Sequence, residues 1–134
     1  MKRKIITSLL VICCFFLFTH CKTMRPLPES YKTYTVVEAK NVLESILNGQ
    51  VKHSPSDVFV GDKFFKVTYD GHHTHMVNYA DLGKMVIYEY PNYFNVVMYN
   101  KKGREVNKVV TKDLEQCHDL LSAIKIMQKT NIGN

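Results

Sequence analysis

The stretch KMVIYEYPNYFNVVMY spans residues 84–99 and predicts a β-hairpin. Val86, Tyr88 and Tyr90 alternate with the residues between them, and the same period of two returns over 94–99. Pro91-Asn92 supplies the turn between the two runs. A connection this short leaves no room for a crossover helix, so the two strands must be antiparallel.

The same pattern extends outward from this hairpin. Phe65 and Val67 share one face of a run at 64–69, and turn signals follow at 70–71, 81–83 and 100–103. Together these runs predict a meander of about five antiparallel strands, with a short extra strand at 58–60. The expected sheet is open or forms a partly open barrel of five to six strands.

Two helices flank the predicted sheet. Thr35 and Glu38 fit a capping box at the start of a helix over 36–48, which ends at Gly49. A second, amphipathic helix is predicted over 112–128, because Leu114, Cys117 and later apolar residues recur at steps of three and four. The fold class is therefore α+β, with the second helix covering the sheet.

Length and composition limit this fold to one domain. The chain has 134 residues, of which 46% are hydrophobic and 22% are charged, as in an ordinary globular protein. The folded domain is expected over residues 35–134.

The first twenty residues predict an export signal. Lys2, Arg3 and Lys4 precede an apolar run over 5–18, which has the order of charge and hydropathy of a signal peptide. That run is short for a permanent span, which needs about 20 apolar residues. Residues 1–20 are therefore expected to be a signal peptide.

The signal is followed by Thr19-His20-Cys21, which resembles the lipobox of bacterial lipoproteins. The resemblance implies cleavage before Cys21, acylation of Cys21 and anchoring of the exported protein to a membrane of the cell envelope. Ordinary cleavage near Cys21 and an uncleaved anchor are the alternatives. Residues 21–34 contain Pro26 and Pro28 without an apolar period, so they are expected to form a lipid-anchored tether.

Charge and cysteine content agree with that location. The net charge is +6, and loss of Lys2, Arg3 and Lys4 leaves 15 basic and 12 acidic residues. This small, dispersed surplus suits an anionic membrane surface better than nucleic acid, so no nucleic-acid partner is expected. If Cys21 is acylated, Cys117 has no partner for a disulfide in the exported chain.

Residues 58–128 resemble a pleckstrin-homology-like barrel. The segment 76–82, the strand and hairpin of 84–99, the turn at 100–103 and a closing amphipathic helix follow the order of elements of that fold. Similar domains occur in small bacterial lipoproteins. The resemblance implies a shape and not a ligand.

The densest group of potential ligands is Gly71-His72-His73-Thr74-His75. His73 and His75 lie two residues apart on a predicted strand and share a face, and His72 lies in the preceding turn. Imidazoles in this arrangement suit Zn²⁺ or Cu²⁺, with Asp70 as a further candidate ligand. The alternative is that these residues decorate an exposed hairpin tip.

The remaining candidate groups predict no enzyme. Cys117 and His118 point in different directions on one helix, and Cys117 belongs to the apolar stripe. Lys101, Lys102 and Arg104 are expected at a solvated hairpin tip; the alternative is contact with anionic headgroups. The sequence contains no G-x-S-x-G, H-E-x-x-H, C-x-x-C or phosphate-binding glycine loop.

Tyrosines are frequent in the predicted sheet, where they act first as strand formers and core residues. A tyrosine face left uncovered by the helices would offer a surface for a protein partner. The tyrosines of the predicted sheet are Tyr69, Tyr79, Tyr88, Tyr90, Tyr93 and Tyr99.

The sequence thus predicts a non-enzymatic cell-envelope lipoprotein whose domain binds a partner protein or a ligand. The alternative is a periplasmic transition-metal-binding protein that uses His72, His73 and His75. A hydrolase would require a cluster of nucleophile and carboxylate that the sequence does not display.

Overall fold

The computed structural model describes residues 22–132 of the chain. The signal peptide expected over 1–20 and the acylation expected at Cys21 lie outside these residues. The elements follow in the order β1 (Thr23–Arg25), α2 (Val36–Asn48), β2 (Asp57–Val60), β3 (Phe64–Tyr69), β4 (His73–Asn78), the short 3₁₀ helix η1 (Tyr79–Asp81), β5 (Leu82–Tyr90), β6 (Tyr93–Asn100), β7 (Glu105–Thr111) and α3 (Leu114–Ile132).

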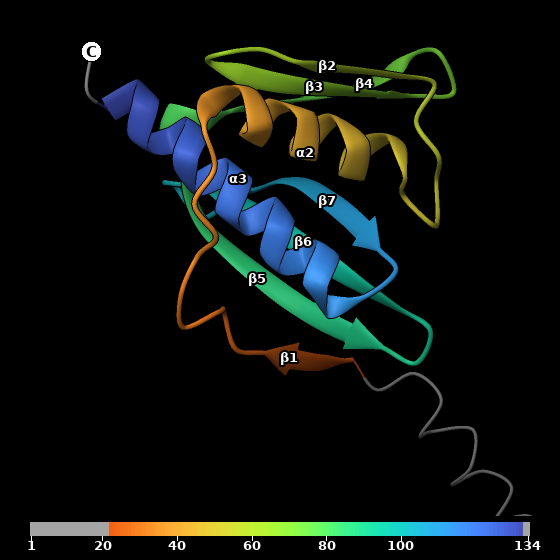
Figure 1. Cartoon of the computed structure of the whole chain (residues 1–134). Helices are drawn as coiled ribbons and strands as arrows, with labels where there is room; N and C mark the ends of the chain where they lie inside the picture. The colour runs from red at the N-terminus through yellow and green to blue at the C-terminus, as the bar shows by residue number, and fades with distance from the viewer. Residues whose placement is uncertain (1–21, 133–134) are drawn as a thin grey trace, which may run out of the picture.

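The strands form two antiparallel sheets, as Figure 1 shows. One sheet has the order β1-β5-β6-β7, and the other has the order β2-β3-β4. The α+β class is confirmed, but the strands described here form no closed barrel, and the pleckstrin-homology-like shape is not confirmed. The physical reason is η1, which separates β4 from β5. Tyr79 of η1 is fully buried, so the chain turns into the core there and begins a new sheet.

Helix α2 begins and ends where the sequence predicts. The Thr35 hydroxyl accepts the N–H of Glu38 at 3.2 Å, and the Glu38 carboxylate accepts the N–H of Thr35 at 2.7 Å, so the capping box is confirmed. Helix α3 covers 114–132 instead of 112–128. Its last turn is held by Asn131, whose side chain donates to the carbonyl oxygens of Met127 and Asp62. Within residues 22–132, neither helix is long and apolar enough to cross a bilayer.

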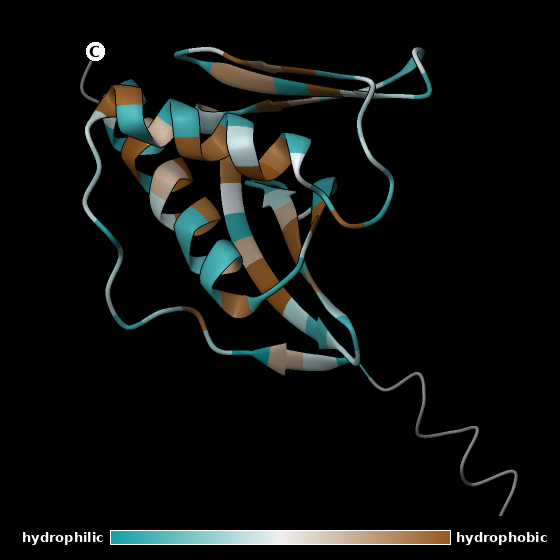
Figure 2. Ribbon diagram, turned by 45° about the vertical axis from the view of Figure 1, so that its right-hand side comes forward, coloured by the Kyte–Doolittle hydropathy of each residue, from teal (hydrophilic) through white to brown (hydrophobic). Residues whose placement is uncertain are grey.

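The core lies between the helices and the two sheets. Figure 2 shows apolar residues on the sides of α2 and α3 that face each other and the strands. Each fully buried leucine, valine or isoleucine contributes about 1.5–3 kcal/mol to folding through the loss of apolar surface from water. Residues that are entirely buried include Leu43, Leu47, Phe65, Ile87, Val96, Met98, Leu120, Leu121 and Ile124.

The segment expected as a lipid-anchored tether contacts the domain at both ends of residues 22–34. Residues 23–25 form β1, which pairs with β5 in the register Thr23↔Glu89. Further along, the backbone N–H of Lys32 donates to the Ser122 hydroxyl at 3.0 Å. The Tyr34 hydroxyl donates to Asp119 at 3.1 Å, so this segment is held against α3.

Candidate functional site

The histidine group lies at the end of the β3–β4 hairpin. Asp70 and Gly71 have φ values of 51° and 72°, and the N–H of His72 donates to the Tyr69 carbonyl at 3.1 Å. Two successive residues with positive φ turn the chain tightly, and an Asp-Gly pair tolerates that conformation well. The turn therefore brings His73 and His75 onto β4 directly after it.

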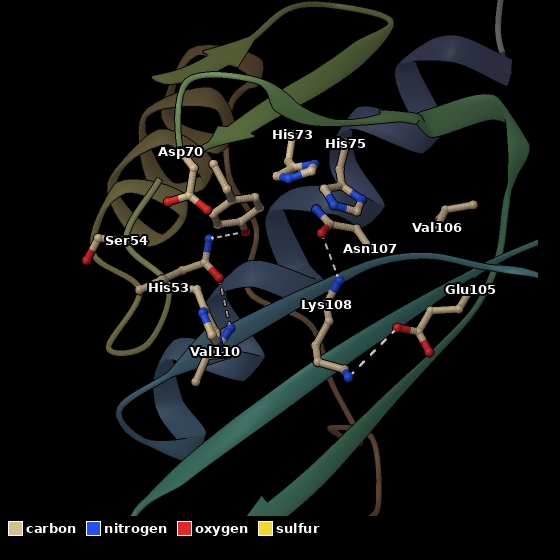
Figure 3. Close-up of a pocket in the computed structure, with 12 residues that line it drawn as sticks. His53, Ser54, Asp70, His73, His75, Glu105, Val106, Asn107, Lys108 and Val110 are labelled. Atoms are coloured by element: carbon tan, nitrogen blue, oxygen red, sulfur yellow. Dashed lines mark hydrogen bonds and ion pairs between the residues drawn. The ribbon is translucent and has the colours of Figure 1, made fainter. Parts of the chain in front are cut away.

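His73 and His75 share a face of β4, as the spacing predicts, and both are exposed. They line a cavity of about 490 Å³ between the β3–β4 hairpin, β7 and the loop after α2. Figure 3 shows both imidazoles on the side of β4 that is turned toward β7. His53 reaches the same cavity from the loop after α2. A volume of this size suits a small molecule.

Gln50 fixes one wall of the cavity. Its Oε1 accepts the backbone N–H of Val110 on β7 at 3.2 Å, and its Nε2 donates to the Tyr69 hydroxyl on β3 at 3.0 Å. The same Nε2 donates to the Leu47 carbonyl at 3.2 Å. Gln50 is only 5% exposed. One buried amide therefore connects the two sheets and α2 beside the cavity.

Asn107 on β7 lines the same cavity and carries a buried, unpartnered donor. Its Oδ1 accepts the backbone N–H of Lys108 at 2.8 Å, which fixes the orientation of the amide. Its Nδ2 is buried and has no hydrogen-bond partner among residues 22–132. Figure 3 draws this amide beneath the imidazole of His75. Leaving such a donor unpaired costs about 1–3 kcal/mol.

Several other polar groups that line the cavity can donate hydrogen bonds, alongside the carboxylates of Asp70 and Glu105. The Tyr69 hydroxyl accepts from Gln50, so its own proton remains free to donate. The Lys108 ammonium lies 3.9 Å from Glu105, which is a loose, exposed ion pair that a ligand can replace. The ring of His75 lies edge-on to Tyr69, with 5.9 Å between the ring centroids. This set of donors fits a ligand with acceptor oxygens.

Of the three histidines predicted as a metal site, two line the cavity and one does not. His73 and His75 line the cavity, whereas His72 does not; its ring lies 4.3 Å from that of His73, centroid to centroid. Over residues 22–132 there is no group of three or more His, Cys, Asp or Glu side chains placed to hold a metal ion. The structure instead joins His73 and His75 with His53, which the sequence analysis did not single out.

Cys117 is buried, as its place on the apolar stripe predicts. Its Sγ lies 3.0 Å from the Thr111 hydroxyl oxygen, and the side chain has no exposed surface. Burial raises the pKa of the Cys117 thiol to about 11, while the hydrogen bond to Thr111 lowers it by a smaller amount. A thiol with so high a pKa carries little thiolate at neutral pH, so it is a poor nucleophile.

The lysine cluster and the tyrosines lie apart from the cavity, with the exception of Tyr69. Lys101, Lys102 and Arg104 occupy the exposed turn between β6 and β7, where the Asn100 side chain accepts two backbone N–H groups. Tyr79 is fully buried and belongs to no surface, which corrects its inclusion in a tyrosine face. Burial, and in second place the charge of Asp62, raise the pKa of Tyr79 well above its usual range.

Sequence reasoning identified His73 and His75 but missed Gln50, His53 and Asn107. Each of these polar residues comes from a different part of the chain, so no local spacing links them. The signal that could have indicated the site is the amide of Asn107, which shares a face of its strand with the apolar residue Val109. Comparison with protein families, with curated proteins and with solved structures finds no match to this chain.

Proposed function

We propose that this chain is a non-enzymatic lipoprotein of the bacterial cell envelope that binds a small carboxylate-bearing molecule in the cavity. The observation that carries the proposal is the buried, unpartnered Nδ2 of Asn107. A buried donor without a partner calls for an explanation, and for a residue that lines a cavity a bound acceptor group is one such explanation.

The chemistry of the wall supports a carboxylate. Asn107 and Tyr69 offer neutral donors, the imidazoles of His73 and His75 each offer an N–H, and Lys108 offers a positive charge. Hydrogen bonds from such donors to an ionised oxygen are stronger than those to a neutral one. Asp70 and Glu105 also line the cavity and oppose a negative ligand, so the proposal rests on the donors of Asn107, Tyr69 and the two imidazoles and on the charge of Lys108.

Anchoring through Cys21 remains part of the proposal and rests on the lipobox resemblance. Palmitate labelling of cells that express the wild type and Cys21→Ala tests it. Label on the wild type alone supports acylation, and label on neither protein contradicts it. We also propose that the domain resembles pleckstrin-homology-like domains in the order of its elements, which is a meander followed by the closing helix α3. This resemblance suggests no ligand.

Side-chain amide resonances provide a direct test of the cavity. We would titrate the ¹⁵N-labelled full chain in detergent micelles with N-acetylglycine and, separately, with its methyl ester, which lacks the charge. The Asn107 NH₂ resonances should shift with the acid and shift much less with the ester. Asn131 is the internal control, because its Nδ2 already donates to two carbonyl oxygens and should not respond.

The variant Asn107→Leu completes the test. It removes the donor while keeping a side chain of similar volume, so the acid should no longer shift the resonances of His73 and His75. Equal responses to the acid and to the ester, or an unchanged response in Asn107→Leu, would contradict the proposed site.

A further inference from the structure

The described chain begins beside the β5–β6 hairpin. Lys22 directly follows Cys21 in the sequence, and β1 starts at the next residue. Thr23 pairs with Glu89, near the end of β5, and Arg25 forms an ion pair with Glu89. In Figure 1, β1 and the turn between β5 and β6 lie at the same end of the molecule. A lipid on Cys21 would therefore be attached close to this turn.

The same end carries aromatic and basic side chains, which we name the hairpin-end surface: Lys22, Met24, Lys52, Tyr90 and Tyr93. The rings of Tyr90 and Tyr93 stack with 4.7 Å between centroids and 9° between planes. The Lys52 ammonium lies 3.7 Å above the Tyr93 ring. Met24 on β1 adds an apolar side chain that is 61% exposed.

The charges at this end are mainly positive. Lys22 lies over the ring of Tyr88 with 4.6 Å to its centroid, and its charge has no ion-pair partner among residues 22–132. Lys52, which lies over the ring of Tyr93, also has no ion-pair partner among these residues. The nearby carboxylate of Glu89 is neutralised by Arg25. The hairpin-end surface therefore offers unpaired positive charge next to tyrosine rings.

We propose that the hairpin-end surface rests on the anionic surface of the bilayer that holds the lipid anchor. This inference rests on the proposed acylation of Cys21. Tyrosines with an apolar ring and a polar hydroxyl are enriched at the level of lipid headgroups, and lysines next to an anionic leaflet are attracted to it. Only Lys22 separates Cys21 from β1, and β1 pairs with β5. The domain therefore has little freedom to move away from its anchor.

The exposed cluster Lys101, Lys102 and Arg104 is the competing basic site. It lies in the β6–β7 turn, and consecutive turns of an antiparallel sheet are at opposite ends of the strand they share. β1 runs along the part of β5 next to the other turn. The cluster therefore faces away from the anchor and serves as a matched control.

Tryptophan fluorescence tests this orientation, because the chain contains no tryptophan. The full chain with Tyr93→Trp is purified in its acylated form and reconstituted into vesicles of phosphatidylglycerol and phosphatidylethanolamine. Brominated lipids should quench the new tryptophan. Phe59→Trp is the control, since Phe59 is 48% exposed on β2 of the other sheet and should be quenched little.

Charge substitutions give a second readout in the Tyr93→Trp background. Lys22→Gln together with Lys52→Gln should lower the ratio of docked to undocked protein about 25-fold, since each lysine near an anionic surface contributes about fivefold. Lys101→Gln together with Lys102→Gln should leave the quenching unchanged.

The intact mass of the same sample separates the two proposals. An acylated chain in which Tyr93→Trp is quenched no more than Phe59→Trp overturns the orientation and leaves the lipoprotein proposal standing. Equal effects of the two lysine pairs also overturn the orientation. A chain that carries no acyl group overturns the anchoring on which the orientation rests.

Discussion

The side-chain oxygen of Gln50 accepts the backbone N–H of Val110 at 3.2 Å, which ties the loop after α2 to the outer edge of β7. The N–H of Val51 donates to the Val110 carbonyl at 3.4 Å, so both backbone groups of Val110 are satisfied from this loop. Without that contact the cavity would lose its wall, and the two sheets would lose their shared polar link to α2.

Replacing Gln50 by leucine should lower the free energy of unfolding by about 1–3 kcal/mol. The substitution keeps the volume but leaves the buried N–H of Val110 without an acceptor. Urea denaturation measures the loss. Asn48→Ala is the control, because its exposed amide bonds only the Glu44 carbonyl and its loss should cost less than about 0.5 kcal/mol. Equal losses in the two variants would contradict the role of Gln50.

Replacing Tyr79 by phenylalanine should leave stability unchanged or raise it by about 1 kcal/mol. The Tyr79 hydroxyl is buried and has no hydrogen-bond partner within residues 22–132, so its removal eliminates an unsatisfied group. Thermal unfolding provides the measurement. The matched variant Tyr34→Phe removes a hydroxyl that donates to Asp119 at 3.1 Å and should instead lower stability. A loss in Tyr79→Phe as large as in Tyr34→Phe would refute this account.

Stability should fall as the pH rises from about 9 to 11. The pKa of the Cys117 thiol is raised from 9.0 to about 11, so the folded state holds this proton more tightly than the unfolded state does. The contribution of this thiol to the free energy of unfolding is complete below pH 9 and is lost by about pH 11, with a total on the order of 2–3 kcal/mol. Unfolding free energies across this range test the effect. Cys117→Ala should flatten the curve between pH 9 and 10, whereas above pH 10 the raised pKa of Tyr79 adds a further fall. A slope that persists unchanged between pH 9 and 10 would assign it to other groups.

Trypsin should cut slowly after Lys32. The N–H of Lys32 is bonded to Ser122, and its ammonium lies 2.5 Å from the Asp119 carboxylate, so cleavage requires this segment to detach from α3. Cleavage after Lys102 in the exposed β6–β7 turn provides an internal reference. Ser122→Ala removes one bond worth about 1 kcal/mol and should accelerate cleavage after Lys32 about fivefold. Equal wild-type rates at Lys32 and Lys102 would show that the segment is free.

Local sequence signals predicted the individual elements well. The capping box of Thr35 and Glu38 and the period-two pattern around Pro91 depend on neighbouring residues, and both are confirmed. The three-residue strand β1 was missed because its residues are all exposed, so it shows no apolar alternation. Its stability comes from β5, which lies far away in the sequence.

The arrangement of the elements was harder to predict. Nothing in the run 76–82 shows that η1 ends one sheet and begins another, because the cause is the burial of Tyr79 among residues distant in sequence. The candidate site has the same limitation. His73 and His75 follow from spacing, whereas the contribution of Asn107 depends on which groups surround its amide in the folded protein.

The pairing of β1 with β5 also affects the order of events as the chain is made. Arg25 and Glu89 are 64 residues apart in sequence, and chains are synthesised from the N-terminus. The beginning of the domain must therefore wait, unfolded, until most of the protein has emerged. During that interval residues 23–25 have no strand to pair with, because residues 87–89 of β5 emerge only later.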